Sequence, residues 1–294
     1  MMKKIIGGNM MEYTLEINNL SKKYKDFILD DVCFNLEKGY IMGFIGPNGA
    51  GKSTVIRLIM NLVKRNSGEI KLFGLDNLKH EREVKQRIGF VYDENYYYEE
   101  LTIDAMKKIV APFYKEWNEN TFNKYLKDFD LNKKSKIKTL SKGMKMKFSL
   151  AMALSHGAEL IIMDEPTAGL DPVFRSELLD ITHFLIQDEN KSIFFSTHIT
   201  TDLEKVADYI TFINKGKIVF SKSKDEIMDS YFIVKGDKEI LDRDIKSEFL
   251  NVRENSFGFE ALTDDIKKVK SIIKENIIIE KASLEDIMVY TVRR

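Results

Sequence analysis

The segment GPNGAGKST, residues 46–54, combines residue types and a spacing suited to binding phosphate groups. It matches the pattern G-x-x-x-x-G-K-[ST] and lies between an apolar run and an amphipathic stretch, as that pattern requires. Its glycines let backbone N–H groups surround phosphate oxygens, and the N-terminus of the following helix adds partial positive charge. The sequence therefore predicts a nucleotide-phosphate site formed by Gly46, Pro47, Asn48, Gly49, Ala50, Gly51, Lys52, Ser53 and Thr54.

Asp164 and Glu165 supply the carboxylates that such a site needs. They follow the apolar run LIIM, so we expect them at the end of a buried strand. There one carboxylate can hold Mg²⁺, directly or through water, and the other can polarise an attacking water molecule. In the loop, Lys52 is expected to reach the β- and γ-phosphates and the Ser53 hydroxyl to bind Mg²⁺.

The elements that must position these residues alternate along the chain. Residues 12–44 read as short strands, KSTVIRLIMNLV as a helix, and KSIFFSTH as a further buried strand. The segment DYITFINKGKIVFSKS reads as a hairpin turning at residues 214–216. Alternating strands and helices predict an α/β fold with a parallel sheet, in which ligands lie at the carboxyl ends of the strands.

Three further segments complete a resemblance to a known family. LSKGM at 140–144 lies between the two motifs, and AGLDP at 168–172 and STH at 196–198 follow them. In this order the segments resemble the nucleotide-binding subunit of an ABC transporter over about residues 12–222. The resemblance implies a P-loop NTPase fold of ABC type with a parallel sheet core, N-terminal antiparallel strands and a helical subdomain at about 89–158, with ATP and Mg²⁺ as cofactors.

The resemblance also implies a role for individual residues. Asp164 matches the Mg²⁺-associated acid, Glu165 the catalytic base, and His198 the histidine that contacts the γ-phosphate. Tyr24, in the segment KKY, would stack on adenine; the alternative is an ordinary tyrosine at a sheet edge.

A second cassette, identical or different, is implied as a partner. Ser141 and Gly143 match the signature residues that contact the γ-phosphate held by the other subunit, and Asp171 matches the acid that crosses the dimer interface. Two cassettes would then clamp two ATP molecules head to tail, and pairing would depend on ATP.

The signature LSKGM departs from the family pattern LSGGQ. Lys142 replaces a glycine and Met144 replaces the glutamine. A lysine is tolerable beside an anion, whereas Met144 loses a polar contact. Alternatively, Lys142, Lys145 and Lys147 form a solvated helix face.

The segment IGFVYDENYYYEEL, residues 88–101, is a second departure, because Asp93 stands where the family has a glutamine. We expect Asp93 to take over the contacts of that glutamine with Mg²⁺ and the lytic water; the neighbouring Glu94 is the alternative. Tyr96, Tyr97 and Tyr98 would anchor the membrane partner, or else form a solvated aromatic loop.

Composition limits the other classes of function. Lys+Arg and Asp+Glu balance at 46 each, so we expect no nucleic-acid partner. A lone cysteine, Cys33, fits a reducing cytoplasm. The apolar run at the N-terminus is too short for a signal peptide, and no window suits a spanning helix. We therefore expect a cytoplasmic chain, held at the inner face of the cell membrane through a partner.

Residues 223–294 lie beyond the cassette. Their pattern reads strand–helix–strand–strand–helix–strand and resembles a ferredoxin-like split unit. Ser283 and Asp286 are expected to cap a last helix. This α+β domain would stabilise or pair subunits, or alternatively sense a ligand.

The function implied is that of an ATPase subunit powering a separate membrane-spanning subunit, with closest likeness to ABC-2-type exporters of the bacterial multidrug and antibiotic-resistance kind. The alternative is a non-transport ABC ATPase acting on a soluble macromolecular partner. A nucleotide-gated partner without turnover is disfavoured, because Lys52 and Glu165 are both present.

Overall fold

A six-stranded sheet forms the centre of the molecule in the computed structural model, which describes residues 5–6, 9–10, 12–92, 97–273 and 276–292. Its strands are parallel except β12, which pairs with β11 through the predicted hairpin at Lys215 and Gly216. In spatial order they are β12 (Lys217–Ser223), β11 (Tyr209–Asn214), β5 (Ile41–Ile45), β10 (Ser192–Thr197), β9 (Leu160–Asp164) and β8 (Ile88–Val91).

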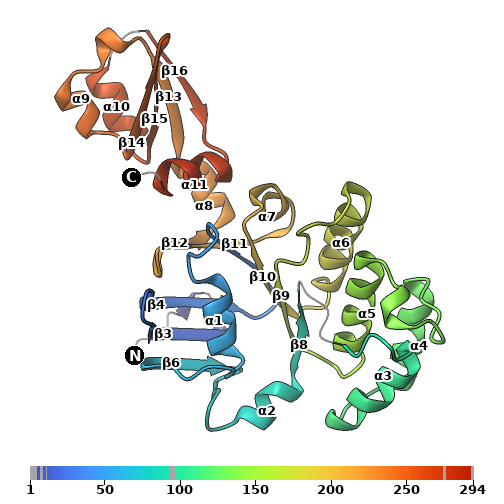
Figure 1. Cartoon of the computed structure of the whole chain (residues 1–294). Helices are drawn as coiled ribbons and strands as arrows, with labels where there is room; N and C mark the ends of the chain where they lie inside the picture. The colour runs from blue at the N-terminus through green and yellow to red at the C-terminus, as the bar shows by residue number, and fades with distance from the viewer. Residues whose placement is uncertain (1–4, 7–8, 11, 93–96, 274–275, 293–294) are drawn as a thin grey trace.

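A second, antiparallel sheet covers one face of this centre (Figure 1). Apolar side chains from this sheet, from α1 (Lys52–Ile59) and from one face of the central sheet form one core. The strands of the second sheet are β4 (Ile28–Glu37), β3 (Tyr13–Lys23), β6 (Ser67–Leu72) and β7 (Leu75–Asp76); a separate pair near the N-terminus is β1 (Ile5–Ile6) and β2 (Asn9–Met10). The expected parallel core with N-terminal antiparallel strands is confirmed.

Helices cover the other face of the central sheet and share a larger core with it (Figure 1). Thr102 caps α3, accepting a hydrogen bond from the Ala105 N–H at 3.1 Å. Residues 89–91, assigned to the helical subdomain from sequence, instead lie in β8, because their apolar side chains fit the sheet. The helices here are α3 (Ile103–Val110), α4 (Glu119–Asp128), α5 (Lys142–Leu154), α6 (Pro172–Leu185) and α7 (Thr200–Val206), whereas α2 (Glu81–Gln86) packs its Val84 into the first core.

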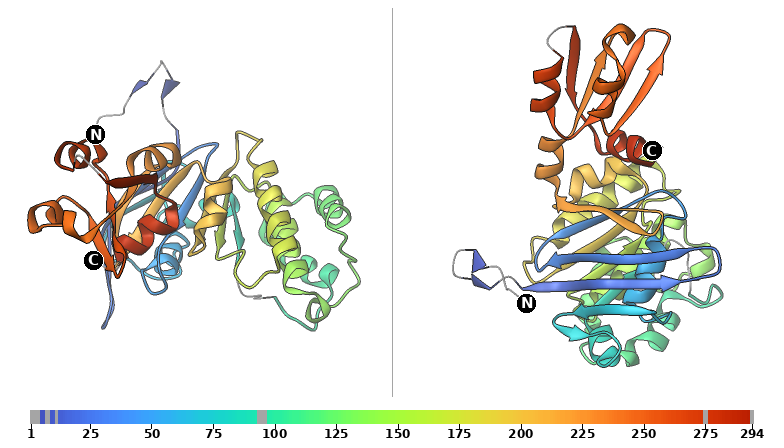
Figure 2. Two further views of the ribbon diagram at one scale, coloured as in Figure 1. Left: turned by 90° about the horizontal axis from the view of Figure 1, so that it is seen from above. Right: turned by 90° about the vertical axis from the view of Figure 1, so that its left-hand side faces the viewer.

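The C-terminal segment forms its own antiparallel sheet in the order β14-β15-β13-β16, the arrangement of a split β-α-β unit. Figures 1 and 2 show it at one end of the cassette. The Leu284 N–H at its last helix donates to Glu204 of α7 at 2.9 Å. Its elements are α8 (Lys224–Ser230), β13 (Phe232–Gly236), α9 (Arg243–Ser247), β14 (Asn251–Asn255), β15 (Gly258–Thr263), α10 (Ile266–Ile272), β16 (Ile277–Lys281) and α11 (Leu284–Val292).

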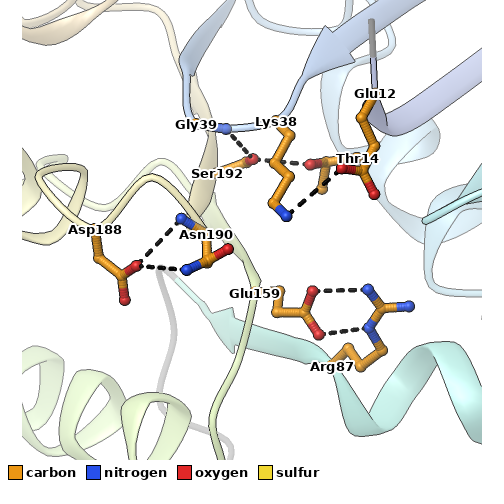
Figure 3. A network of polar contacts seen from close by, with 9 residues as sticks. All are labelled: Glu12, Thr14, Lys38, Gly39, Arg87, Glu159, Asp188, Asn190 and Ser192. Carbon is orange, nitrogen blue, oxygen red and sulfur yellow. Dashed lines mark hydrogen bonds and ion pairs between the residues drawn. The ribbon is translucent and has the colours of Figure 1, made fainter. Parts of the chain in front are cut away.

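Polar contacts hold the starts of the central strands together (Figure 3). Arg87, before β8, makes a bidentate pair with Glu159, before β9, at 2.6 and 2.7 Å. The Ser192 hydroxyl, at the start of β10, lies 2.8 Å from that of Thr14 and accepts from the Gly39 N–H. Because the starts are fixed in register, the opposite, carboxyl ends of β5, β9 and β10 meet at one edge. The phosphate loop, Asp164, Glu165 and His198 lie at that edge.

No helix in the described part of the chain is long and apolar enough to cross a membrane.

Candidate nucleotide site

The predicted phosphate loop connects β5 to α1, at the carboxyl edge of the central sheet. Gly49 and Gly51 have φ of 78° and 114°, in the left-handed region that favours glycine. A Cβ on Gly51 would lie 2.9 Å from the Phe27 ring, so only glycine fits between the loop and this aromatic side chain. The loop is therefore shaped by its glycines as the sequence indicates.

Lys52, Glu165 and His198 form a connected chain across this edge. The Lys52 Nζ lies 3.1 Å from Glu165 Oε1 and donates to the Gly46 carbonyl at 2.7 Å. The other carboxylate oxygen, Oε2, lies 2.8 Å from His198 Nδ1 and accepts from the His198 backbone N–H at 3.2 Å. Three residues far apart in sequence thus meet because β5, β9 and β10 are adjacent.

Glu165 is held in an uncommon backbone conformation. Its φ is 48°, and its N–H donates to the Ser196 carbonyl at 2.8 Å, which fixes the residue against β10. A left-handed residue other than glycine costs about 1–3 kcal/mol and is often found at functional sites. Here the conformation turns the carboxylate toward both Lys52 and His198.

Asp164 offers a carboxylate that fits a bound cation. Its Oδ1 atom is buried and accepts no hydrogen bond from any described residue. Burial raises the pKa of Asp164 by more than the nearby Ser196 and Ser53 hydroxyls and Lys52 lower it, and the Glu165 charge raises it further. An unpartnered carboxylate oxygen beside the Ser53 hydroxyl is a suitable oxygen ligand set for Mg²⁺, which usually takes one or two protein oxygens together with phosphate and water.

Lys52, Ser53, Glu165 and His198 line a cavity of about 690 Å³, large enough for a nucleotide, whereas Asp164 is not among its lining residues. The sequence interpretation missed Asp26 and Phe27, which line it, while Tyr24 is not among its lining residues and is 38% exposed. Periodicity cannot rank two aromatic residues three positions apart, so this distinction needed the fold. The lining residues are Asp26, Phe27, Pro47, Asn48, Gly49, Gly51, Lys52, Ser53, Thr54, Glu165, Ala168 and His198.

Ser141, Gly143 and Asp171 come together at a separate pocket of about 190 Å³. The Ser141 hydroxyl caps α5 by accepting from the Met144 N–H at 3.2 Å. The Asp171 carboxylate caps α6, accepting from the backbone N–H groups of Val173 and Phe174 at 3.1 and 3.0 Å. These three side chains do not line the chain's own phosphate cavity.

The tyrosines at 96–98, predicted to anchor a membrane partner, are not arranged alike where the structure describes them. Asp93, Glu94 and Tyr96 lie outside the described residues. Tyr97 packs inward, with its ring 4.8 Å from that of Phe148, and burial raises its pKa to about 12. Tyr98 alone of the two described tyrosines points to solvent, at 67% exposed. The prediction of an outward anchor is thus wrong for Tyr97, because its ring fills the core beside α5.

Comparison with known proteins supplies the family. The ABC transporter family pattern matches residues 29–168. The bacitracin transport ATP-binding protein BcrA of Bacillus licheniformis is 34% identical over 71% of this chain and 69% of its own length. The lantibiotic transport ATP-binding protein SrtF of Streptococcus pyogenes is 36% identical over 72% of this chain and 91% of its own.

One relative extends into the C-terminal segment, and a solved structure supports the fold. The uncharacterized ABC transporter ATP-binding protein YdbJ of Bacillus subtilis is 30% identical over 91% of this chain, so the match includes much of residues 223–294. A solved ATP-binding subunit of an ABC transporter has a TM-score of 0.65 at 29% identity, covering 74% of this chain and 92% of its own. The chain belongs to the ABC transporter family, as an ATP-binding subunit with ATPase activity.

Proposed function

We propose that this ATPase powers a separate membrane-spanning subunit of an exporter, and that hydrolysis occurs in the 690 Å³ cavity. The observation that carries the proposal is the chain of contacts from Lys52 through Glu165 to His198. A γ-phosphate bound in this cavity would lie beside a phosphate-binding cation, Lys52, a base, Glu165, and a second polar group, His198.

The Lys52 ammonium is paired with the Glu165 carboxylate. Phosphate oxygens entering the loop would attract the Lys52 ammonium, and Glu165 Oε1 would then be available to accept a proton from water. His198 keeps the carboxylate oriented through Oε2. Asp164 and Ser53 would hold Mg²⁺, whose charge offsets that of the phosphates. The adenine end would contact Phe27, which lines the cavity, and Tyr24, which is 38% exposed, would supply a second aromatic surface.

The chain would work as one half of a pair. Ser141 and Gly143 lie at the first turn of α5, whose N-terminus favours an anion. Since they border a pocket separate from the chain's own phosphate cavity, they would serve ATP bound to a second cassette. Asp171 would reach the same junction from the start of α6. Asp93 remains our candidate for the glutamine's role, with Glu94 as the alternative.

The hydrolytic assignment is tested by replacing Glu165 with glutamine in the purified chain. We expect ATP turnover to fall about 100-fold or more, because an amide cannot accept the proton from water. ATP binding should persist, since Lys52 is unchanged. The matched control is Glu189→Gln at an exposed position, which should retain full turnover. Unchanged hydrolysis in Glu165→Gln would refute the assignment.

The transport assignment is tested separately, by searching the neighbouring reading frames for a multi-spanning membrane protein and expressing the chain together with it. The names of the bacitracin and lantibiotic relatives favour antibiotics of these two kinds as cargo, which we propose is carried outward. We expect the pair to raise resistance to such peptides and the Glu165→Gln pair not to do so. Co-purification with ribosomes, and no membrane partner, would favour the alternative of a soluble macromolecular target.

A further inference from the structure

Lys142, one of the two residues that depart from the signature pattern, connects the start of α5 to a loop 26 residues later in the chain. Its Nζ donates a hydrogen bond to the backbone carbonyl of Ala168 at 2.6 Å. Lys142 is the first residue of α5, directly after the cap Ser141. Ala168 follows Glu165 by three residues, in the loop between β9 and α6. A glycine at position 142 could not make this contact.

The contact lies where the loop passes from one pocket to the other. Ala168 lines the phosphate cavity, whereas the next three residues, 169–171, line the signature pocket. Lys142 therefore holds the loop at the point where it passes from the phosphate cavity to the pocket lined by Ser141, Gly143 and Asp171.

A second contact joins α5 to α6, the helix that follows this loop. A Cβ on Gly143 would lie 2.9 Å from the Phe174 ring, so the first turn of α5 rests directly against the first turn of α6. Lys147, one turn later on α5, places its Nζ 5.3 Å from the centre of that ring and 2.7 Å from Glu177. With α5 and α6 joined in this way, a shift of the loop at Ala168 is transmitted to the signature turn through Lys142.

We propose that Lys142 is a positioning residue that couples occupancy of the chain's own ATP cavity to the signature pocket facing a second copy. The inference rests on the two-cassette arrangement proposed above. Loss of the contact would leave the phosphate loop intact, because Lys142 does not line that cavity. It would let the signature turn and the loop move independently, so that bound ATP would favour pairing less strongly.

The test uses the full chain with Glu165→Gln, in which ATP should accumulate paired cassettes. Lys142→Met keeps the length of the side chain but removes its donor. We expect the ATP concentration for half-maximal pairing, measured by analytical ultracentrifugation, to rise about three- to tenfold, the net size of one typical hydrogen bond. The affinity of the monomer for a fluorescent ATP analogue should not change. In the hydrolytic background the Hill coefficient for ATP should fall toward one.

The matched control is Lys145→Met, which removes the same charge from the same helix but breaks a pair with Glu99 outside the pocket. It should leave pairing within about twofold of the parent, and Lys142→Arg, which retains a donor, should recover most of the loss. The proposal is overturned if Lys142→Met pairs like the parent, if both methionine variants act alike, or if monomer affinity falls by the same factor. Absence of ATP-dependent pairing in the Glu165→Gln parent would refute the two-cassette arrangement itself, a distinguishable result.

Discussion

Two adjacent acidic residues at the end of β9 are suited to function at the expense of stability. Glu165 is held at φ 48°, and Asp164 keeps a buried oxygen without a hydrogen bond from a described residue. A cation in the cavity would satisfy the Asp164 oxygen, whereas contacts with Ser196, Lys52 and His198 hold the Glu165 conformation and direct its carboxylate toward the cavity. At the scale of single residues, the strained backbone of Glu165 and the unpartnered oxygen of Asp164 are the strongest indications of a functional site.

Asp164→Asn is expected to stabilise the nucleotide-free chain while abolishing Mg²⁺-dependent hydrolysis. Because burial raises the folded-state pKa of Asp164, the folded chain binds a proton more readily than the unfolded chain. The carboxyl thus contributes its stability below the unfolded pKa and loses it as pH rises through the raised value. The neutral amide lacks this loss, so we expect a gain of about 0.5–2 kcal/mol in the free energy of unfolding at pH 8.

Urea unfolding at several pH values measures this effect. The advantage of Asp164→Asn should shrink as the pH falls, since the native carboxyl then becomes neutral as well. Asp188→Asn is the contrasting control, because hydrogen bonds from Lys191 hold the pKa of Asp188 below its usual value. An Asp164→Asn variant less stable than the parent at pH 8 would contradict the prediction.

The sequence predicted candidate functional residues most directly where they lie in one contiguous motif. The phosphate loop and the acidic strand end are contiguous motifs, so their residues could be named with their roles before the fold was known. The contacts among Lys52, Glu165 and His198 depend instead on strand order, which only the resemblance implied. Phe27 and the Lys142–Ala168 contact could not be predicted, since each depends on how a side chain packs between elements.

The segment after β8 shows how packing of an element overrides a pattern. A run of tyrosines beside acids favours a surface loop, yet of its two described members Tyr97 packs against Phe148 of α5 and Tyr98 is exposed. The two neighbours therefore have different tasks, one fixing the segment to the helices and the other available at the surface.

Tyr97→Ala and Tyr98→Ala should separate these tasks. We expect Tyr97→Ala to lower the free energy of unfolding by about 2–4 kcal/mol, because it removes an aromatic ring from the core. Tyr98→Ala should change it by less than about 0.5 kcal/mol. Chemical denaturation of the two variants checks this, and equal losses would show that Tyr97 is not the inward anchor.

Helices α6 and α7 are joined by an ion pair with a buried acid. The Arg175 Nε donates to Asp202 Oδ1 at 2.6 Å, Arg175 also bonds the Thr201 hydroxyl at 2.8 Å, and Asp202 has no exposed surface. The pair links the helix capped by Asp171 to the helix that follows His198. It therefore connects the predicted dimer junction to the hydrolytic centre.

Arg175→Met should destabilise the chain by about 2–4 kcal/mol, because it leaves a buried carboxylate without its cation. Adding Asp202→Asn, which removes the charge at nearly constant volume, should recover at least half of that loss. Urea unfolding of the parent, the two single variants and the double variant gives the free energies of unfolding for this double-mutant cycle. Simple additivity of the two losses would contradict a direct pairing.

At the scale of the whole molecule, the C-terminal module is attached where the cassette can influence it. Its last helix, α11, packs beside α7, and Ile287 and Tyr290 belong to the same core as the helices over the central sheet (Figure 1). The module's other core, around Phe249 and Phe259, is its own. The connection to the site thus runs through α7, which begins two residues after His198.

Ile287→Ala is expected to loosen this attachment and to speed hydrogen exchange in α7 as well as in α11. Ile287 is 1% exposed, so its truncation should cost about 2–4 kcal/mol in the free energy of unfolding of the docked helix. Ile278→Ala is the matched control, because that side chain is 62% exposed on β16 and should change neither property. Faster exchange confined to α11 would show that the module does not stabilise α7. Faster exchange in both helices, together with slower ATP turnover, would show that the module supports His198. The reason is that α7 fixes the end of the loop that carries this histidine.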